Sequence, residues 1–355
     1  MTLADIAKLR LISQQIDSSD FESAADMVKW LGAIQAQEYA QSKWSIGLRL
    51  QHLTDSIIEK EISDAHILRT HLLRPTWHFI AAEDIRWMLK LTAPRVNAVN
   101  AYMYRKTEID AKTFNRCHDI ITKALQGNKH LTREQLNSEF AKKNIMADGV
   151  KLACLLMHAE LEGLICNGIT QGKQFTYALL EERVPAQKEK TYDESLAELT
   201  QRYFKSRGPA TLKDYSTWSG LTLAECKKGL EIVKSHFTSK TVENETYYFD
   251  PAILDAKKIN SRVELLPIYD EFIMGYKDRD AILQHKNTLN SKPFSVFDPT
   301  ILYEGQIMGT WKRVIKQKHI ELKYEFIKPL TKIQKTEFDN AINRFEHYSG
   351  LYINY

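Results

Sequence analysis

The sequence predicts an α+β protein that repeats one order of elements along the chain. Apolar residues at three-to-four spacing recur in blocks that indicate amphipathic helices, and each group of blocks is followed by two strand-like runs around a turn. From Arg262 onward, strand-like runs dominate. Helices followed by a hairpin is the order of a winged helix. We therefore predict three tandem winged-helix units, followed by a small β-rich, barrel-like C-terminal part with a closing helix.

The first predicted unit covers residues 1–112 and includes connecting helices. Its first two helices carry apolar residues on one stripe, and Gly32 is expected to end the second of them. The expected elements are helices at 5–16 and 22–31, shorter helices near Trp44 and Ile57, and strands at 66–72 and 76–80 around Arg74-Pro75.

The same order recurs in two further units, at 113–186 and 187–258. In each, three helical patterns precede two strand-like runs that are joined by a short polar turn. The second unit is expected to have helices at 115–125, 132–143 and 149–162, and strands at 164–167 and 175–179. The third is expected to have helices at 194–205, 211–218 and 223–233, and strands at 237–242 and 246–249.

The C-terminal part, 259–355, is predicted to form a small sheet covered by one helix. Glu304-Gly305 is expected to make a tight turn between two of its strands. The expected strands are 263–266, 271–276, 301–304, 306–311 and 319–326, and the expected helix is 332–345.

Composition limits the class of protein. With 355 residues, of which 43% are hydrophobic and 26% charged, the chain is long enough to bury a substantial core. No apolar run approaches the roughly 18 to 20 residues that a membrane span needs, and the first residues lack the apolar stretch of a secretory signal. We therefore expect a cytoplasmic protein that does not enter a membrane.

The cysteines and histidines suggest no metal chemistry. Four cysteines are too few and too scattered for a disulfide framework, and they form no Cys-x-x-Cys pair for zinc. His158-x-Glu160 resembles half of a nucleobase-deaminase signature, but the cysteine half is missing and both residues fit a helix surface. We expect reduced thiols and no metal site.

Charge is unevenly distributed although the net charge is only +4. Between Lys312 and Lys335 stand eight lysines and arginines against Glu321 and Glu325, a local excess of +6. Such a run is commonly a solvated face. The alternative interpretation is a strip that contacts phosphates.

The most informative stretch is Gly32 to Gln41, which follows the expected end of a helix. In a helix, Gln35 and Gln37 would lie about 200° apart and could not converge. In an extended segment they share one face, with Ile34 and Ala36 buried opposite. We predict the extended form, with both side chains facing a basic cleft. The alternative is a pair of ordinary surface hydrogen-bonding residues.

Several motifs, in this order and spacing, resemble those of the AlkZ-like (YcaQ-related) bacterial DNA glycosylases. The resemblance covers most of the chain, and the family combines three tandem winged helices with a β-rich C-terminal part. The motifs are Leu31 to Gln37, Leu73 to Phe79, Arg207 to Thr211, Trp218 to Leu221, Leu265 to Phe272 with Gly275 to Arg279, and Gly309 to Arg313.

The resemblance implies an activity and its catalytic residues. Gln35-Ala36-Gln37 matches the Gln-x-Gln form of the family signature, so Gln35 and Gln37 are the expected catalytic pair. The implied reaction is hydrolysis of the N-glycosidic bond of alkylated purines in double-stranded DNA, notably N7-alkylguanine and, in some members, interstrand crosslinks. No cofactor and no obligate protein partner are implied. Glu38 would point to the other face of an extended segment and is a less favoured base.

The shared motifs also supply candidate DNA contacts, although a structural role is a real alternative for several of them. Asp270 and Tyr269 are expected to be structural. The main rival to an enzyme is a non-catalytic winged-helix DNA-binding protein or transcription regulator, from which only the glutamine pair separates this sequence. The candidate DNA contacts are Arg74, Trp77, His78, Tyr276, Arg279, Trp311, Lys312 and Arg313.

Overall fold

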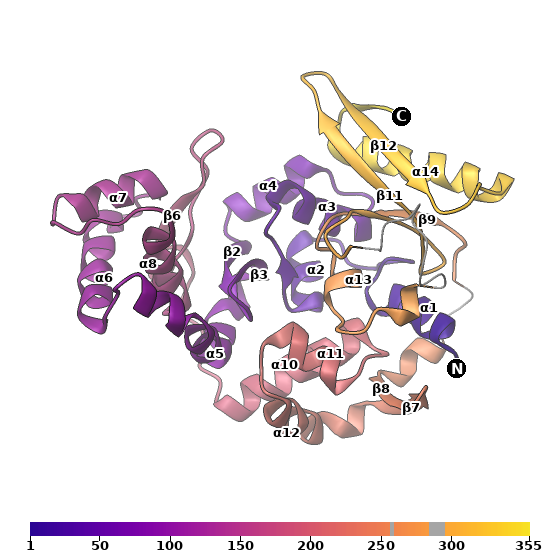
Figure 1. The fold of residues 1–355 in the computed structure, drawn as a ribbon, viewed down its shortest axis with the longest axis horizontal. Helices are drawn as coiled ribbons and strands as arrows, with labels where there is room; N and C mark the ends of the chain where they lie inside the picture. Colours follow the sequence, from indigo (N-terminus) through magenta and orange to yellow (C-terminus); the bar gives the residue numbers. More distant parts are fainter. Residues whose placement is uncertain (256–258, 284–294) are drawn as a thin grey trace.

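A computed structural model describes residues 1–255, 259–283 and 295–355. It confirms an α+β fold, in which helices carry four small sheets (Figure 1). The elements within residues 3–81, here called the first group, lie in the middle of the molecule. The second group, within residues 111–179, lies on one side of them and the C-terminal sheet on the other.

The first group contains the predicted helices and strands in the predicted order. Gly32 ends the second helix with φ +73°, a backbone conformation that favours glycine. Its three strands form one antiparallel sheet in the order β1-β3-β2. The elements are α1 (Leu3–Ser13), α2 (Ala24–Leu31), β1 (Ile34–Gln35), α3 (Tyr39–Arg49), α4 (Asp55–Ser63), β2 (Ile67–Leu72) and β3 (Thr76–Ala81).

A long helix, α5 (Ile85–Lys106), connects the first group to the second. Neither α5 nor any other helix in the described residues is both long and apolar enough to cross a membrane. In the second group, a two-residue strand that the sequence pattern did not predict, β4, joins the predicted hairpin in the order β4-β6-β5. Its elements are α6 (Ala111–Leu125), β4 (Leu131–Thr132), α7 (Arg133–Ala141), α8 (Gly149–Leu161), β5 (Ile165–Asn167) and β6 (Thr176–Leu179).

The third group follows a short helix, α9 (Leu180–Arg183). Each of its three main helices is preceded by a threonine whose hydroxyl accepts from the backbone N–H three residues later. The acidic side chain of that later residue accepts in turn from the backbone N–H of the threonine. These capping boxes fix the helix starts. The elements are α10 (Tyr192–Arg207), α11 (Leu212–Ser219), α12 (Leu223–Val233), β7 (Thr238–Val242) and β8 (Glu245–Phe249).

The C-terminal part is one five-stranded sheet covered by α14 (Lys332–Ser349) (Figure 1). Its order is β13-β12-β11-β10-β9, and the two edges do not pair within the described residues, so the sheet is open. Positive φ at Glu304 and Gly305 confirms the predicted turn. The strands are β9 (Val263–Leu266), β10 (Thr300–Tyr303), β11 (Gln306–Ile315), β12 (His319–Phe326) and β13 (Tyr352–Asn354).

One predicted strand is wrong. Residues 271–276 do not continue the sheet, because the short helix α13 (Glu271–Met274) occupies their start. Asp270 causes the change: its carboxylate accepts from the Phe272 backbone N–H and so caps the helix. Glu271, Phe272, Ile273 and Tyr276 of this run are all buried.

Two hydrophobic cores hold the molecule together, and they do not follow the chain order. One joins α5, the second group and the third group to one side of the β2–β3 hairpin of the first group. The other joins the first group to the C-terminal sheet and α14, with Trp44 and Trp311 both packed against Phe345. The predicted boundaries at 112 and 186 remain predictions, and the one at 258 lies outside the described residues.

A buried ion pair fastens α3 to the start of α13. Arg49 donates two hydrogen bonds to Asp270, at 2.8 and 2.9 Å, and both side chains are fully buried. Burial alone would raise the pKa of Asp270, but Arg49, Ser45 and a backbone N–H hold it below its usual value. The carboxylate is therefore charged inside the protein.

We predict that Asp270→Asn lowers the free energy of unfolding by about 3–5 kcal/mol, because it leaves the Arg49 charge buried without a partner. Denaturant-induced unfolding measures this loss. The control is Asp64→Asn, which removes a carboxylate paired with Lys60 at the surface and should change stability little.

The effect of Asp270→Asn should also depend on pH. Because the folded-state pKa of Asp270 lies below its unfolded value, its contribution is complete above about pH 4 and is lost as the pH falls through the folded-state pKa. The stability gap between wild type and variant should therefore narrow in acid. A gap that stays constant down to pH 2, or a loss no larger than that of Asp64→Asn, would show that the pair is not stabilising.

Candidate active site

The Gln35-Ala36-Gln37 segment forms the edge of the first sheet, between α2 and α3. Ile34 pairs with Phe79 and Gln35 with His78, which confirms the predicted extended conformation. Ile34 and Ala36 are fully buried, as expected for the face opposite the glutamines.

β1 ends at Gln35, because the hydrogen bonds of the next residue, Ala36, do not both continue the ladder with Trp77. The Ala36 N–H donates to the Trp77 carbonyl at 2.6 Å. The returning Trp77 N–H does not reach the Ala36 carbonyl; it donates to Oε1 of Gln37 at 2.8 Å. The Ala36 carbonyl accepts from Nε of Arg69 instead, at 3.0 Å. The Gln37 amide is thus held in one orientation at the edge of the hairpin.

Gln35 lies deeper than Gln37. Its side chain is only 4% exposed, and its Oε1 accepts from Nη2 of Arg74 at 3.1 Å. Both amide oxygens therefore bond to the short segment from Arg74 to Trp77, but only Gln37 is exposed at the surface. The two side chains therefore converge on the same hairpin segment, as predicted. They do not face one common cleft, because Gln35 is buried and Gln37 is exposed.

A buried carboxylate fixes the backbone of this strand. Oε1 of Glu271 accepts from the Gln35 N–H at 2.9 Å, and its Oε2 accepts from Arg207 at 2.6 Å and from the Trp218 indole at 2.9 Å. Arg207 also donates to the carbonyls of Leu31 and Ala33. Glu271 and Arg207 are both fully buried. With their polar atoms bonded in this way, the pair costs less to bury than two separate charges.

Tyr276 belongs to this buried framework, so the prediction that it contacts DNA is corrected. Its ring is 1% exposed and lies under the guanidinium of Arg10, 3.5 Å from the ring centroid. Its hydroxyl donates to the Arg207 carbonyl at 2.9 Å and accepts from Gln14. A phosphate cannot reach a side chain enclosed in this way.

Trp311 and His78 are also interior residues and not the surface contacts that we predicted. Trp311 is 1% exposed because it points from β11 toward α14, and its indole donates to the Leu266 carbonyl at 2.8 Å. His78 is fully buried on β3. Burial and, next, the charge of Arg74 hold the pKa of His78 well below its usual value, so the ring is neutral.

Four of the five remaining predicted contacts are cations, and their side chains differ in exposure. Arg74 and Arg279 are half-buried and donate to backbone carbonyls, of Trp218 in the first case and of Ile273 in the second. Lys312 is exposed and lies directly opposite Lys323 in the β11–β12 pair. The next residue, Arg313, points to the other face, where its guanidinium lies 5.6 Å from the Phe345 ring centroid.

A pocket of about 370 Å³ lies beside Trp77, between the first and second groups. Arg69 and Trp77 line it from the β2–β3 hairpin, and Lys173, Phe175 and Tyr177 line it from the turn and strand of the β5–β6 hairpin. Trp77 is the one predicted DNA contact among the lining residues, whereas Arg69 and Phe175 were not predicted as site residues. A single arginine inside the apolar run of β2 was the available signal, because charged residues are rarely buried without a reason.

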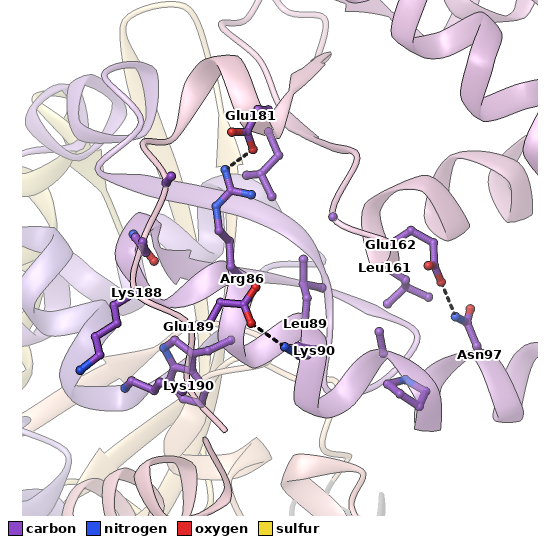
Figure 2. Close-up of a pocket in the computed structure, with 17 residues that line it drawn as sticks. Arg86, Leu89, Lys90, Asn97, Leu161, Glu162, Glu181, Lys188, Glu189 and Lys190 are labelled. Carbon is purple, nitrogen blue, oxygen red and sulfur yellow. Dashed lines mark hydrogen bonds and ion pairs between the residues drawn. The ribbon is translucent and has the colours of Figure 1, made fainter. Parts of the chain in front are cut away.

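A larger pocket, of about 690 Å³, lies elsewhere (Figure 2). It is lined by α5, the end of α8 and the linker at 186–190, and none of the predicted site residues lines it. Figure 2 shows cations at its rim in ion pairs, Arg86 with Glu181 at 2.9 Å and Lys90 with Glu189 at 3.1 Å. With these cations already paired, we do not assign it to the site.

The described residues contain no group of three or more His, Cys, Asp or Glu side chains that could hold a metal ion. All four cysteines are free and buried, and burial raises the pKa of the Cys166 thiol to about 12. The prediction that Glu160 lies on a helix surface is wrong: it is fully buried, and His71 Nδ1 lies 2.5 Å from its carboxylate.

Comparisons with known proteins identify the family of the chain. The family model described as "DNA glycosylase AlkZ-like" matches residues 28–348. The "Interstrand DNA cross-link repair glycosylase" of Streptomyces sahachiroi is 21% identical over 321 residues, which cover 86% of each chain. The solved structure "Streptomyces sahachiroi DNA glycosylase AlkZ" superposes with a TM-score of 0.80 at 18% identity, covering 100% of this chain and 99% of that one. The chain therefore belongs to the AlkZ-like DNA glycosylase family.

Proposed function

We propose that this protein hydrolyses the N-glycosidic bond of alkylated purines in double-stranded DNA, with N7-alkylguanine as the substrate class and crosslinks through that atom as further substrates. One observation carries the proposal. The exposed Gln37 amide is held by the Trp77 N–H at the edge of the β2–β3 hairpin, and a buried carboxylate, Glu271, fixes the backbone of β1 two residues before it. The interstrand cross-link repair glycosylase of S. sahachiroi, which matches along most of the chain, supports crosslinked DNA as a substrate.

The chemistry suits a neutral amide. Alkylation at N7 makes guanine cationic and a good leaving group, so little acid catalysis is needed. An amide cannot act as a general base near neutral pH, but its carbonyl can orient water and place partial negative charge beside an oxocarbenium-like sugar. Oε1 of Gln37 accepts one bond from Trp77, and a carbonyl oxygen has a second lone pair for water. The rate gain then comes from positioning.

The two glutamines have different tasks in this proposal. Gln37 contacts the attacking water, because it is the exposed member of the pair. Gln35 links Arg74 to the Glu271 framework and so fixes the hairpin against which Gln37 lies. Glu38 is exposed beside them and is the competing candidate for a base.

We infer that the enzyme is monofunctional, with water rather than a lysine amine as the nucleophile. Lys43, on the helix that follows the glutamines, is ion-paired with Asp55 at 2.9 Å and with Glu59 at 2.7 Å. A nucleophilic amine must be neutral and free, and this arrangement favours neither.

We further propose that the three helix groups are winged-helix units and that duplex DNA lies across the side that carries Gln37. Lys312 and Lys323 support a phosphate contact on the C-terminal sheet. Like charges directly opposite each other destabilise a strand pair, and a bound phosphate removes that repulsion. Their exposure suits such a contact, whereas Arg313 faces the helix.

We predict that Gln37→Ala lowers single-turnover base release from a duplex with one N7-methylguanine by about 10²-fold or more, because a water-positioning contact is lost. Affinity for undamaged duplex should change little, since a neutral side chain neutralises no phosphate. Base release and a binding titration measure the two quantities.

The matched control for that comparison is Glu38→Gln at the neighbouring exposed position. It should retain most of the base-release rate if Gln37 orients the water. If Glu38→Gln abolishes release while Gln37→Ala does not, Glu38 is the base. A wild type that releases no base yet selects one operator from random DNA would make the protein a regulator.

A second prediction concerns salt. Replacing Lys312 and Lys323 by Gln should lower the slope of log affinity against log salt by nearly two, since each phosphate contact contributes about 0.9. The control is the double replacement of Lys8 and Lys29, which removes the same charge from two residues that are paired with Glu304 and Glu83. Equal flattening in both double variants would indicate a general effect of net charge and no contact at this strand pair.

A further inference from the structure

Arg69 is a nearly buried cation without an ion-pair partner in the described part of the chain. It lies in the middle of β2, between buried Leu68 and Thr70, and is 8% exposed. The two carboxylates that act on it are Glu160 and Glu38, and neither forms a salt bridge with it. Burial lowers the pKa of Arg69, which expresses the cost of removing this charge from water.

The guanidinium of Arg69 is held in a fixed orientation. Its Nε donates to the Ala36 carbonyl, inside the Gln-Ala-Gln segment. Its carbon lies 4.2 Å from the Trp77 ring centroid and 4.8 Å from that of Phe175, so aromatic rings from two different groups pack on it. Such cation–π contacts orient a guanidinium but do not use its N–H donors.

The outer donors of Arg69 remain unused. A guanidinium has five N–H donors, and the side-chain bond of Arg69 within the described residues uses only the one on Nε. Arg69 lines the pocket of about 370 Å³ beside Trp77, and the other charged residues of that lining are Arg133, Lys173 and Glu134, an excess of one positive charge beyond Arg69. The carboxylate of Glu160 does not accept from the terminal nitrogens of Arg69, because it is fully buried and bonded to His71.

We propose that the two terminal nitrogens of Arg69 bind a phosphate of the strand that carries the damaged base, and so place that nucleotide over Gln37. The inference rests on the proposed function and adds a substrate-positioning residue to it. A planar guanidinium fork matches two phosphate oxygens. Because Nε of Arg69 donates to the carbonyl of Ala36, the residue before Gln37, a phosphate on the terminal nitrogens would lie beside Gln37.

Charge balance favours the same ligand. An unpaired cation beside an oxocarbenium-like sugar would raise the barrier to bond cleavage. A phosphate on Arg69 neutralises that cation when the substrate is bound. The site is therefore expected to favour DNA in which this one phosphate carries its charge.

The alternative is that Arg69 only braces the two hairpins through Trp77 and Phe175. A bracing role would change protein stability but would not make excision depend on a single phosphate of the DNA. The two roles can therefore be separated by changing the DNA and leaving the protein intact.

The test uses duplexes with one N7-methylguanine and one neutral methylphosphonate, moved in turn through the phosphates on either side of the lesion. With the wild-type protein, one position should lower single-turnover excision about tenfold to a hundredfold, the usual range for a charge-assisted hydrogen bond. The other positions should have smaller and similar effects.

Variants assign that position to Arg69. Arg69→Met should lose about the same factor on normal DNA and show no further loss when the sensitive phosphate is neutral. Arg69→Lys should recover only part of the rate, since it keeps the charge without the fork. The matched control is Lys173→Met, an exposed cation of the same pocket, which should leave the position-specific loss intact.

Each outcome distinguishes the two proposals. If the wild type releases no base from any duplex, the proposed function fails. If it releases base but no single phosphate matters, or if Arg69→Met keeps the full sensitivity, the assignment of Arg69 is wrong and the function stands. If Arg69→Met does not fold, the wild-type scan still tests whether a single phosphate controls excision, and Arg69→Lys, which keeps the charge without the fork, tests the assignment to Arg69.

Discussion

The buried ion pair between Arg207 and Glu271 is the interaction on which the candidate site depends. It joins the end of α10 to the start of α13, and both partners also bind the backbone around β1. Asp270, the preceding residue, holds Arg49 of α3 in the same way. Two adjacent carboxylates on one short helix thus fix the segments on both sides of the glutamines. Loss of either partner in these pairs would leave a charge in a fully buried position. Other arrangements of these segments are therefore unfavourable.

This rigidity matters because the proposed catalyst is weak. A glutamine carries no charge and no titratable proton near neutral pH, so it can contribute only by being in the correct place. The framework below β1 supplies that placement, and the bond from Trp77 to Gln37 fixes the amide itself. In the proposed reaction, an N7-alkylated base supplies the leaving group, so the glutamine needs only to position the water.

The sequence predicted local structure better than it predicted environment. Helices, hairpins and the extended glutamine segment follow from short-range periodicity and turn residues, which are visible in the chain. The strand expected at 271–276 failed because capping by Asp270 outweighs an apolar pattern. Tyr276, Trp311 and His78 lie in recognisable motifs, but their burial depends on segments distant in sequence. Arg69 was missed for the same reason, since Phe175 reaches it from another group.

A crystal structure with a duplex that carries a 2′-fluorinated N7-methylguanine nucleotide tests the central claim most directly, because fluorine slows formation of the oxocarbenium-like state. The account predicts that Oε1 of Gln37 holds an ordered water facing C1′ of the damaged nucleotide, with the Glu271 contacts to β1 unchanged. A complex in which C1′ faces Glu38 or another carboxylate, with Gln37 turned away, would contradict it.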